Sequence, residues 1–132
     1  MTPEQLRYAK THEWVRVEPG PAGAKIAVVG ISDFAVKLLT DLVYLNLPPV
    51  GRQVEKGQPL GEVESVKAVS DLYSPVDGLV VEVNSDLPEH LDRLSEDPYG
   101  AGWLLKIKIA REEGLNDLMD YAAYQKQIQE EQ

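Results

Sequence analysis

The chain has 132 residues, which is enough for one domain with a modest hydrophobic core but too few for two. Its formal net charge of −9 argues against nucleic acid as a partner, because contact with phosphates needs clustered lysines and arginines. The chain has no cysteine, which excludes disulfides, thiolate metal sites and cysteine nucleophiles.

The apolar residues do not form a membrane segment. No apolar run approaches the roughly 20 residues that a transmembrane helix needs, and residues 1–10 lack the apolar core of a signal peptide. We therefore expect a cytoplasmic protein and a monomer. The acidic surface suits solubility and brief docking to partners with basic patches.

The first part of the chain predicts a β-hairpin. Residues 14–17 alternate apolar and polar side chains, as a half-buried strand does. Residues 19–23 are rich in proline and glycine and predict a turn, and residues 24–30 predict the returning strand.

A short helix and a series of short strands follow the hairpin. Residues 34–39 predict the helix, and Ser32 or Asp33 can cap it, because a side-chain oxygen accepts a free backbone N–H there. Short strands separated by turns predict a sandwich or a barrel. The expected strands are residues 41–47, a short one around Val54, and residues 60–66, 69–73 and 79–83.

The last third of the chain is partly helical. Residues 84–97 are polar, with leucines at helical spacing, and predict one or two helical turns on the surface. Residues 103–109 predict a last strand. After Gly114 the pattern is helical, with Asp120 as a possible N-cap. The apolar face of this helix consists of Tyr121, Tyr124 and Ile128.

Several kinds of catalytic site are missing from the sequence. His12 and His90 are the only histidines, and no further metal ligands lie near them, so we expect no zinc site. The chain has neither a Gly-rich phosphate loop nor a Gly-x-Ser-x-Gly elbow. Its carboxylates are scattered through turns and termini. The sequence therefore does not predict an enzyme.

Lys67 lies between two β-rich runs and should sit at the exposed tip of a hairpin. Most lysines at such tips are ordinary solvated residues. However, the tip Val66-Lys67-Ala68 contains no Gly, Asn or Pro, the residues that usually form hairpin turns. A breach of local rules tends to mark function. Glu64 and Asp71 flank the lysine, so the loop also presents carboxylates.

The segment Glu64-Ser65-Val66-Lys67-Ala68, followed by Ser70-Asp71, resembles the lipoylation motif of the glycine cleavage H-protein family. Further motifs agree with this family in order and spacing, and the resemblance runs from about Tyr8 to about Tyr124. These motifs are His12-Glu13-Trp14, Gly30-Ile31-Ser32-Asp33-Phe34-Ala35 and Asp97-Pro98-Tyr99-Gly100-Ala101-Gly102-Trp103.

The resemblance implies a mostly β fold, the flattened lipoyl/biotinyl-type β-sandwich that is also called a barrel-sandwich hybrid. Short peripheral helices and a C-terminal helix would complete a single domain over residues 1–132, with its core at about 8–110 and a helical segment at about 114–130. Biotin carriers have methionines on both sides of the modified lysine, whereas Val66 and Ala68 stand there in this chain. The expected cofactor is therefore lipoic acid, joined to Lys67 by an amide.

The resemblance also implies two groups of site residues. The cofactor-binding motif consists of Lys67, Glu64, Val66 and Ala68. The residues that match a cleft for the loaded arm are Thr11, Glu13 and Asp71. In that cleft two carboxylates would hold an aminomethyl cation by charge-assisted hydrogen bonds. The sequence leaves open whether Glu13 lines this cleft or is an exposed strand residue.

Proteins of this family are carriers and not enzymes. By resemblance, lipoyl-Lys67 shuttles an aminomethyl group between glycine decarboxylase, aminomethyltransferase and dihydrolipoamide dehydrogenase. A lipoate ligase or a lipoyl/octanoyltransferase would attach the cofactor. The cofactor and the partner enzymes supply the chemistry, and tethering raises the effective concentration of the arm at each enzyme.

Two departures from the family pattern leave the pathway open. Thr40 stands where the family usually has glycine before Asp41, and Leu91-Asp92-Arg93-Leu94-Ser95 replaces a Leu-Val-Asn-like run. Both are expected to spare the lysine loop and to alter a surface beside it. The alternative is an H-like lipoate-binding protein in sulfur oxidation, beside a heterodisulfide-reductase-like complex, or in lipoate relay. A third hypothesis is an unmodified β-sandwich that only binds proteins.

Overall fold

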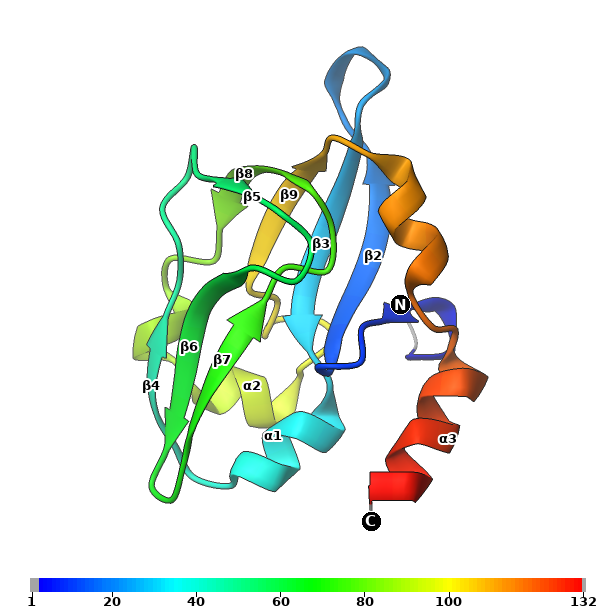
Figure 1. Cartoon of the computed structure of the whole chain (residues 1–132). Coiled ribbons are helices and arrows are strands. Elements are labelled where there is room, and N and C mark those ends of the chain that lie inside the picture. Colours follow the sequence, from blue (N-terminus) through cyan, green and yellow to red (C-terminus); the bar gives the residue numbers. More distant parts are fainter. Residues whose placement is uncertain (1–2, 132) are drawn as a thin grey trace.

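The computed structural model describes residues 3–131, and two antiparallel sheets form its body (Figure 1). The mostly β sandwich that the sequence predicts is confirmed. The larger sheet contains, in spatial order, β1 (Arg7–Tyr8), β2 (Glu13–Pro19), β3 (Lys25–Ile31), β9 (Leu105–Ile109), β8 (Gly78–Val83) and β5 (Gln53–Val54). The smaller sheet contains β4 (Leu42–Asn46), β6 (Pro59–Ser65) and β7 (Val69–Tyr73).

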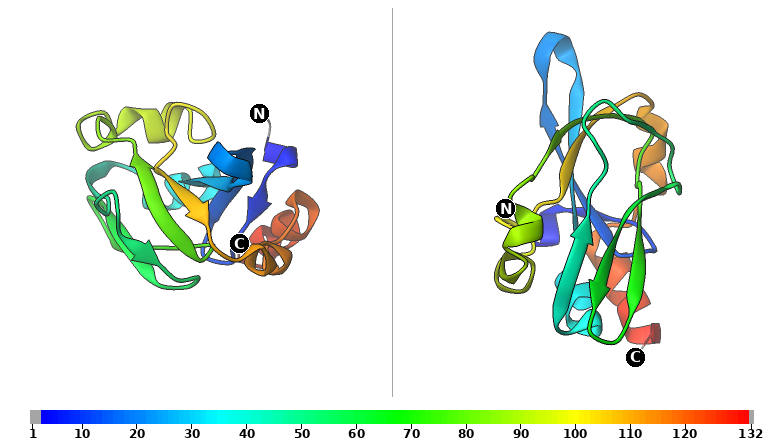
Figure 2. Two further views of the ribbon diagram at one scale, coloured as in Figure 1. Left: turned by 90° about the horizontal axis from the view of Figure 1, so that it is seen from above. Right: turned by 90° about the vertical axis from the view of Figure 1, so that its left-hand side faces the viewer.

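Short helices flank the sheets on opposite sides, with η3 and α2 on one side and η4 and α3 on the other (Figure 2). None of the helices within residues 3–131 is long and apolar enough to cross a membrane. The α-helices are α1 (Asp33–Leu39), α2 (Asp92–Glu96) and α3 (Tyr121–Glu131). The 3-10 helices are η1 (Pro3–Gln5), η2 (Pro21–Gly23), η3 (Leu87–Glu89) and η4 (Glu112–Asp117).

Strand β3 is apolar along most of its length because both of its faces are covered. Val29 joins the main core between the two sheets, while Val28 joins a second cluster that α3 completes. A strand that is buried on both faces loses the polar alternation of a half-exposed one. Gly30 lies opposite Trp14, and a Cβ atom there would lie 2.4 Å from the Trp14 ring, so the position accepts only glycine.

A side chain caps the N-terminus of each of the two longer α-helices, α1 and α3. The Ser32 hydroxyl accepts a hydrogen bond from the Ala35 amide at 3.3 Å, so Ser32 rather than Asp33 caps α1. Asp120 accepts from the Ala123 amide at 2.9 Å at the start of α3. The helical segment expected from about residue 114 is interrupted, because Met119 forms a β-bridge with Tyr8 between η4 and α3.

Residues 84–97 contain the helical turns η3 and α2, which lie on the surface as predicted, but the apolar face of these turns is buried. Leu87 and Leu94 are fully buried in the main core, and Leu91 packs against it. Leucines at helical spacing form one apolar face, and here that face closes an open side of the sandwich. The divergent residues 91–95 therefore include a core residue, on a helix that packs against α1.

Candidate functional site

Lys67 lies at the tip of the β6–β7 hairpin, at the free lower end of the smaller sheet (Figure 1). The two strands pair as far as Glu64 and Val69, and residues 65–68 form the turn. Lys67 is exposed, and its amine has no hydrogen-bond or ion-pair partner among residues 3–131. An amine in this position is open to an enzyme from several directions.

Ser65 supplies the turn chemistry that the sequence was expected to lack. Its buried hydroxyl accepts hydrogen bonds from the backbone amides of Lys67 at 3.3 Å and Ala68 at 3.1 Å. Its own amide donates to the Ala68 carbonyl at 2.8 Å. Serine forms such turns through its side chain, so the absence of Gly, Asn and Pro at this tip is not a breach of turn rules.

The turn before β4 is hydrogen-bonded to the lysine tip. The Val66 amide donates to the Asp41 carbonyl at 2.9 Å. Thr40 precedes it with φ 66° and ψ −128°, a conformation that favours glycine and is costly for a β-branched residue. Thr40 is therefore next in the chain to a residue that is hydrogen-bonded to the lysine loop, and whether the change at Thr40 spares this loop stays a prediction.

Thr11, Glu13 and Asp71, which are far apart in the sequence, line one cleft of about 110 Å³. Thr11 lies in the turn before β2, Glu13 is the first residue of β2, and Asp71 comes from β7 on the other sheet. The remaining lining is mostly apolar. It consists of Ile31, Ala35, Leu38, Leu39, Val63 and Leu72, together with His12 and Ser70.

Glu13 is buried, with 1% of its surface exposed, so its interpretation as an exposed strand residue is wrong. The Thr11 hydroxyl donates to one carboxyl oxygen, and the Tyr73 amide donates to the other at 3.1 Å. Burial raises the pKa of the Glu13 carboxyl to about 7, although these hydrogen bonds favour the charged form. No lysine or arginine among residues 3–131 pairs with this carboxyl.

Asp71 and Thr11 are exposed, in contrast to Glu13. The Tyr73 hydroxyl lies 3.5 Å from an Asp71 oxygen, which is a weak contact at most. The cleft therefore has one carboxyl inside and one on the solvent side. A cationic group that entered from the hairpin tip would meet both.

The outer face of the smaller sheet surrounds Glu64 with apolar side chains. Glu64 pairs with Tyr44 on one side and with Val69 on the other, and both are exposed. Val66, next to the lysine, is 74% exposed, and Ala68 on the other side of the lysine is exposed as well. Tyr44, Val66 and Val69 are therefore large apolar side chains that are left exposed near the lysine.

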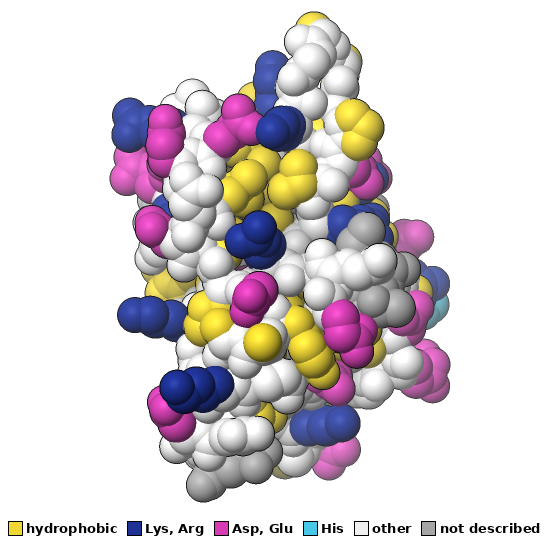
Figure 3. Space-filling model, turned by 90° about the vertical axis from the view of Figure 1, so that its right-hand side faces the viewer, with side chains coloured by type: hydrophobic (Ala, Val, Ile, Leu, Met, Phe, Trp, Pro, Cys, Tyr) yellow, Lys and Arg dark blue, Asp and Glu magenta, His cyan; other side chains and the backbone are white. Residues whose placement is uncertain are grey.

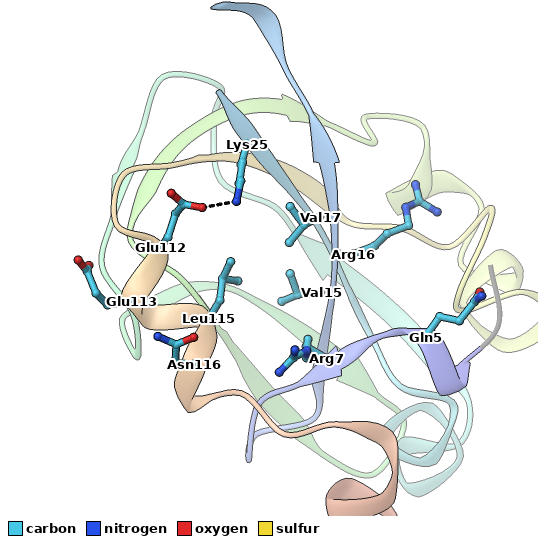
Figure 4. Close-up of a pocket in the computed structure, with 10 residues that line it drawn as sticks. All are labelled: Gln5, Arg7, Val15, Arg16, Val17, Lys25, Glu112, Glu113, Leu115 and Asn116. Carbon is cyan, nitrogen blue, oxygen red and sulfur yellow. Dashed lines mark ion pairs between the residues drawn. The ribbon is translucent and has the colours of Figure 1, made fainter. Parts of the chain in front are cut away.

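A second hollow lies at another part of the molecule, between β2 and η4 (Figures 3 and 4). Val15, Val17 and Leu115 point toward one another in its floor, and an ion pair between Lys25 and Glu112 crosses its upper rim (Figure 4). The cavity has about 640 Å³ but shares no lining residue with the cleft beside β7. We therefore assign no arm-binding role to it.

With this geometry in hand, the comparisons with known proteins decide the family. The family model of the glycine cleavage H-protein matches residues 6–131. The chain belongs to this family. Its assignment from the sequence motifs is confirmed.

Similar proteins match over almost their whole lengths. A glycine cleavage system H protein from Rhodopirellula baltica is 57% identical over 128 residues, which cover 97% of this chain and 96% of that protein. One from Carboxydothermus hydrogenoformans is 44% identical over 131 residues, which cover 99% and 97%. The crystal structure of the H protein from Mycobacterium marinum superimposes with a TM-score of 0.86, at 39% identity, over 97% of this chain and 99% of that one.

Sequence reasoning predicted only Thr11, Glu13 and Asp71 in this cleft and missed the other lining residues, His12 among them. His12 lies between Thr11 and Glu13, and both of its ring nitrogens contact α3. The motif His12-Glu13-Trp14 was visible in the sequence, but nothing in it indicated a contact more than 100 residues away.

Proposed function

We propose that this chain is a lipoyl-carrier protein of glycine cleavage, with lipoic acid attached to Lys67. Family membership supports a carrier role, and the geometry of the tip supports the attachment point. Lys67 is exposed and without a partner, at the end of a hairpin that a buried serine holds in shape. Such a lysine can enter an enzyme active site without any local unfolding.

The residues around the cleft fit a lipoyl arm. Asp71 follows Lys67 by four residues, roughly 13 Å along an extended chain, which an extended lipoyl-lysine side chain can span. Leu38, Leu39 and Leu72 offer an apolar wall to its hydrocarbon chain and ring. When bound, the cofactor supplies a dithiolane whose sulfur takes up the one-carbon unit of glycine.

The buried Glu13 carboxyl is the observation that carries the glycine cleavage assignment. It has no cationic partner among residues 3–131, and burial raises its pKa to about 7. An aminomethyl ammonium group in the cleft would favour the charged form of Glu13 and pair with it out of water. Asp71 would add a second, more exposed carboxylate, and Thr11 would keep one Glu13 oxygen in position.

This carboxyl also separates the two carrier hypotheses. In sulfur oxidation or lipoate relay the cargo is sulfur or the lipoyl group itself, and neither brings a cation to Glu13. For such a cargo, Glu13 would remain a buried carboxyl without a cationic partner, held only by the hydrogen bonds from Thr11 and the Tyr73 amide. The geometry therefore favours the aminomethyl cargo, with glycine decarboxylase, aminomethyltransferase and dihydrolipoamide dehydrogenase as the partners.

The apolar residues around Glu64 suit the enzymes that attach the cofactor. A lipoate ligase or lipoyl/octanoyltransferase that covers Val66, Val69 and Ala68 would bring a basic group to Glu64 at the rim of the contact. Such rim pairs set association rates more than affinity.

The test is to load lipoylated protein with glycine and decarboxylase, and to follow spontaneous release of formaldehyde and ammonia without the transferase. Release should be about tenfold faster in Glu13→Gln, since a shielded charge-assisted hydrogen bond contributes about 1.5 kcal/mol or more. Asp71→Asn should show a smaller increase because its carboxylate is exposed. Failure of wild type to load would favour the sulfur or relay alternative.

A further inference from the structure

His12 connects the arm cleft to the C-terminal helix. His12 lies between Thr11 and Glu13 in the chain and is one of the residues that line the cleft, but both of its ring nitrogens contact α3. Nδ1 lies 2.7 Å from the Tyr124 hydroxyl, and Nε2 lies 3.2 Å from a Glu131 oxygen. No residue of α3 itself lines the cleft.

The backbone of His12 has an unusual conformation, with φ at +81°. Residues other than glycine adopt this region only when their surroundings hold them there. Two backbone hydrogen bonds do so, from the His12 amide to Ala9 at 3.0 Å and from the Ser32 amide to the His12 carbonyl at 2.9 Å. The left-handed residue reverses the chain immediately before β2, so that the next side chain, Glu13, points into the protein.

The Tyr124 hydroxyl contacts His12, which lines the cleft, and Ser32, which caps the helix that forms the apolar wall of the cleft. Besides His12, this hydroxyl lies 2.5 Å from the Ser32 hydroxyl, which caps α1. Helix α1 contributes the apolar wall of the cleft. The Tyr124 ring is buried and stacks on Tyr8 with centroids 4.3 Å apart, so the hydroxyl cannot move without displacing the helix.

One arrangement of protons satisfies this whole chain of contacts. Ser32 donates to Tyr124, Tyr124 donates to Nδ1 of His12, and Nε2 of His12 donates to Glu131, while the Ser32 oxygen still accepts from the Ala35 amide. Burial raises the pKa of Tyr124 to about 12, so its hydroxyl keeps its proton near neutral pH.

We propose that His12 is a positioning residue, which α3 holds through Tyr124, and that this connection keeps Glu13 buried in the arm cleft. The C-terminal helix then controls the protection of the loaded arm from a distance. This protective role rests on the proposed function, whereas the positioning of Glu13 is a property of the unmodified chain and can be measured without the cofactor.

The experiment compares Tyr124→Phe with Tyr121→Phe. Both variants remove one hydroxyl from α3, but the Tyr121 hydroxyl makes no hydrogen bond within residues 3–131. The readout is the titration of the Glu13 carboxyl by carbon-13 NMR in the unlipoylated protein. The Glu13 carboxyl should titrate near pH 7 in wild type and in Tyr121→Phe. In Tyr124→Phe the Glu13 carboxyl should titrate about one pH unit lower, since water that enters the cleft solvates the charged carboxylate.

A second variant covers the case in which Tyr124→Phe does not fold. His12→Asn removes both ring contacts but tolerates the left-handed backbone, and it should lower the Glu13 titration in the same way. An unchanged Glu13 titration in a folded Tyr124→Phe or His12→Asn protein would overturn the proposal.

Spontaneous release of formaldehyde and ammonia from the loaded arm tests whether His12 also matters for the proposed function. This release should be several-fold faster in Tyr124→Phe than in wild type and unchanged in Tyr121→Phe. Equal release rates of formaldehyde and ammonia from wild type, Glu13→Gln and Asp71→Asn would instead show that the cleft does not protect the loaded arm. The Glu13 titration would then still decide whether His12 positions this residue.

Discussion

The lysine tip and the arm cleft are built in opposite ways. The tip is mostly a local structure, because residues 64–69 provide the lysine, the serine that shapes the turn and two exposed valines, while a backbone hydrogen bond from Val66 to Asp41 connects it to the turn before β4. The cleft combines the start of β2, helix α1 and β7, and α3 braces it from outside. In the proposed function the lysine enters other enzymes, so the tip would gain from independence. The cleft would shield the loaded arm from water, which only distant segments packed together can do.

The largest expected effect concerns the tip alone. Lys67→Arg should abolish modification by a lipoate ligase, because a guanidinium does not form the amide under this enzyme, while the unfolding midpoint should stay unchanged. Peptide mass mapping measures the modification. Lys126→Arg, on the exposed side of α3, is the matched control and should be modified fully. Modification of Lys67→Arg, or of another lysine in wild type, would refute the assignment.

The next prediction isolates the burial of Glu13. Its pKa is raised from 4.5 to about 7 in the folded protein, so folding favours the protonated form. The resulting stabilisation is present below pH 4.5 and is lost as the pH rises through 7. Relative to Glu13→Gln, wild type should lose up to roughly 3 kcal/mol of unfolding free energy over this range. Urea unfolding between pH 4.5 and 8 measures it, and parallel curves would mean that Glu13 is solvated.

Substitutions at Thr40 test whether the turn that is hydrogen-bonded to the lysine tip is strained. Thr40→Gly should stabilise the protein by about 1 kcal/mol, because relief of strain at a positive φ outweighs the greater freedom of glycine in the unfolded chain. Thermal or urea unfolding measures the change. Thr40→Ala keeps the strained backbone and should bring no such gain. A loss of stability in the glycine variant would show that the turn is not strained.

The smallest effect is expected at Glu64. Glu64→Ala should slow lipoylation modestly at low salt, by an amount equivalent to about 1 kcal/mol or less, and the difference should fade at high salt. Glu62→Ala is the matched control, because it lies on the same face of β6, two residues farther from the tip. Equal lipoylation rates for Glu64→Ala and wild type at low salt would exclude a role for Glu64 in recognition.

Much of the fold could be predicted from the sequence, because its determinants are local. The alternation of residues 14–17, the turns rich in proline and glycine, and the caps Ser32 and Asp120 all predict elements that the structure contains. The surface helical turns expected within residues 84–97 are present as well, but their leucines are buried in the main core. Helical spacing of leucines shows that one face is apolar, but it does not tell whether another part of the chain covers that face.

The sequence by itself determined the family, the hairpin and the exposed lysine at its tip, since motif and turn depend on neighbours along the chain. Only the tertiary structure decided that Glu13 is buried, that Asp71 lies across a cleft from it, and that Tyr124 holds His12 from a helix 112 residues away. Burial is what raises the pKa of Glu13. It depends on how many other segments exclude water from the carboxyl, and no residue next to Glu13 in the sequence carries that information.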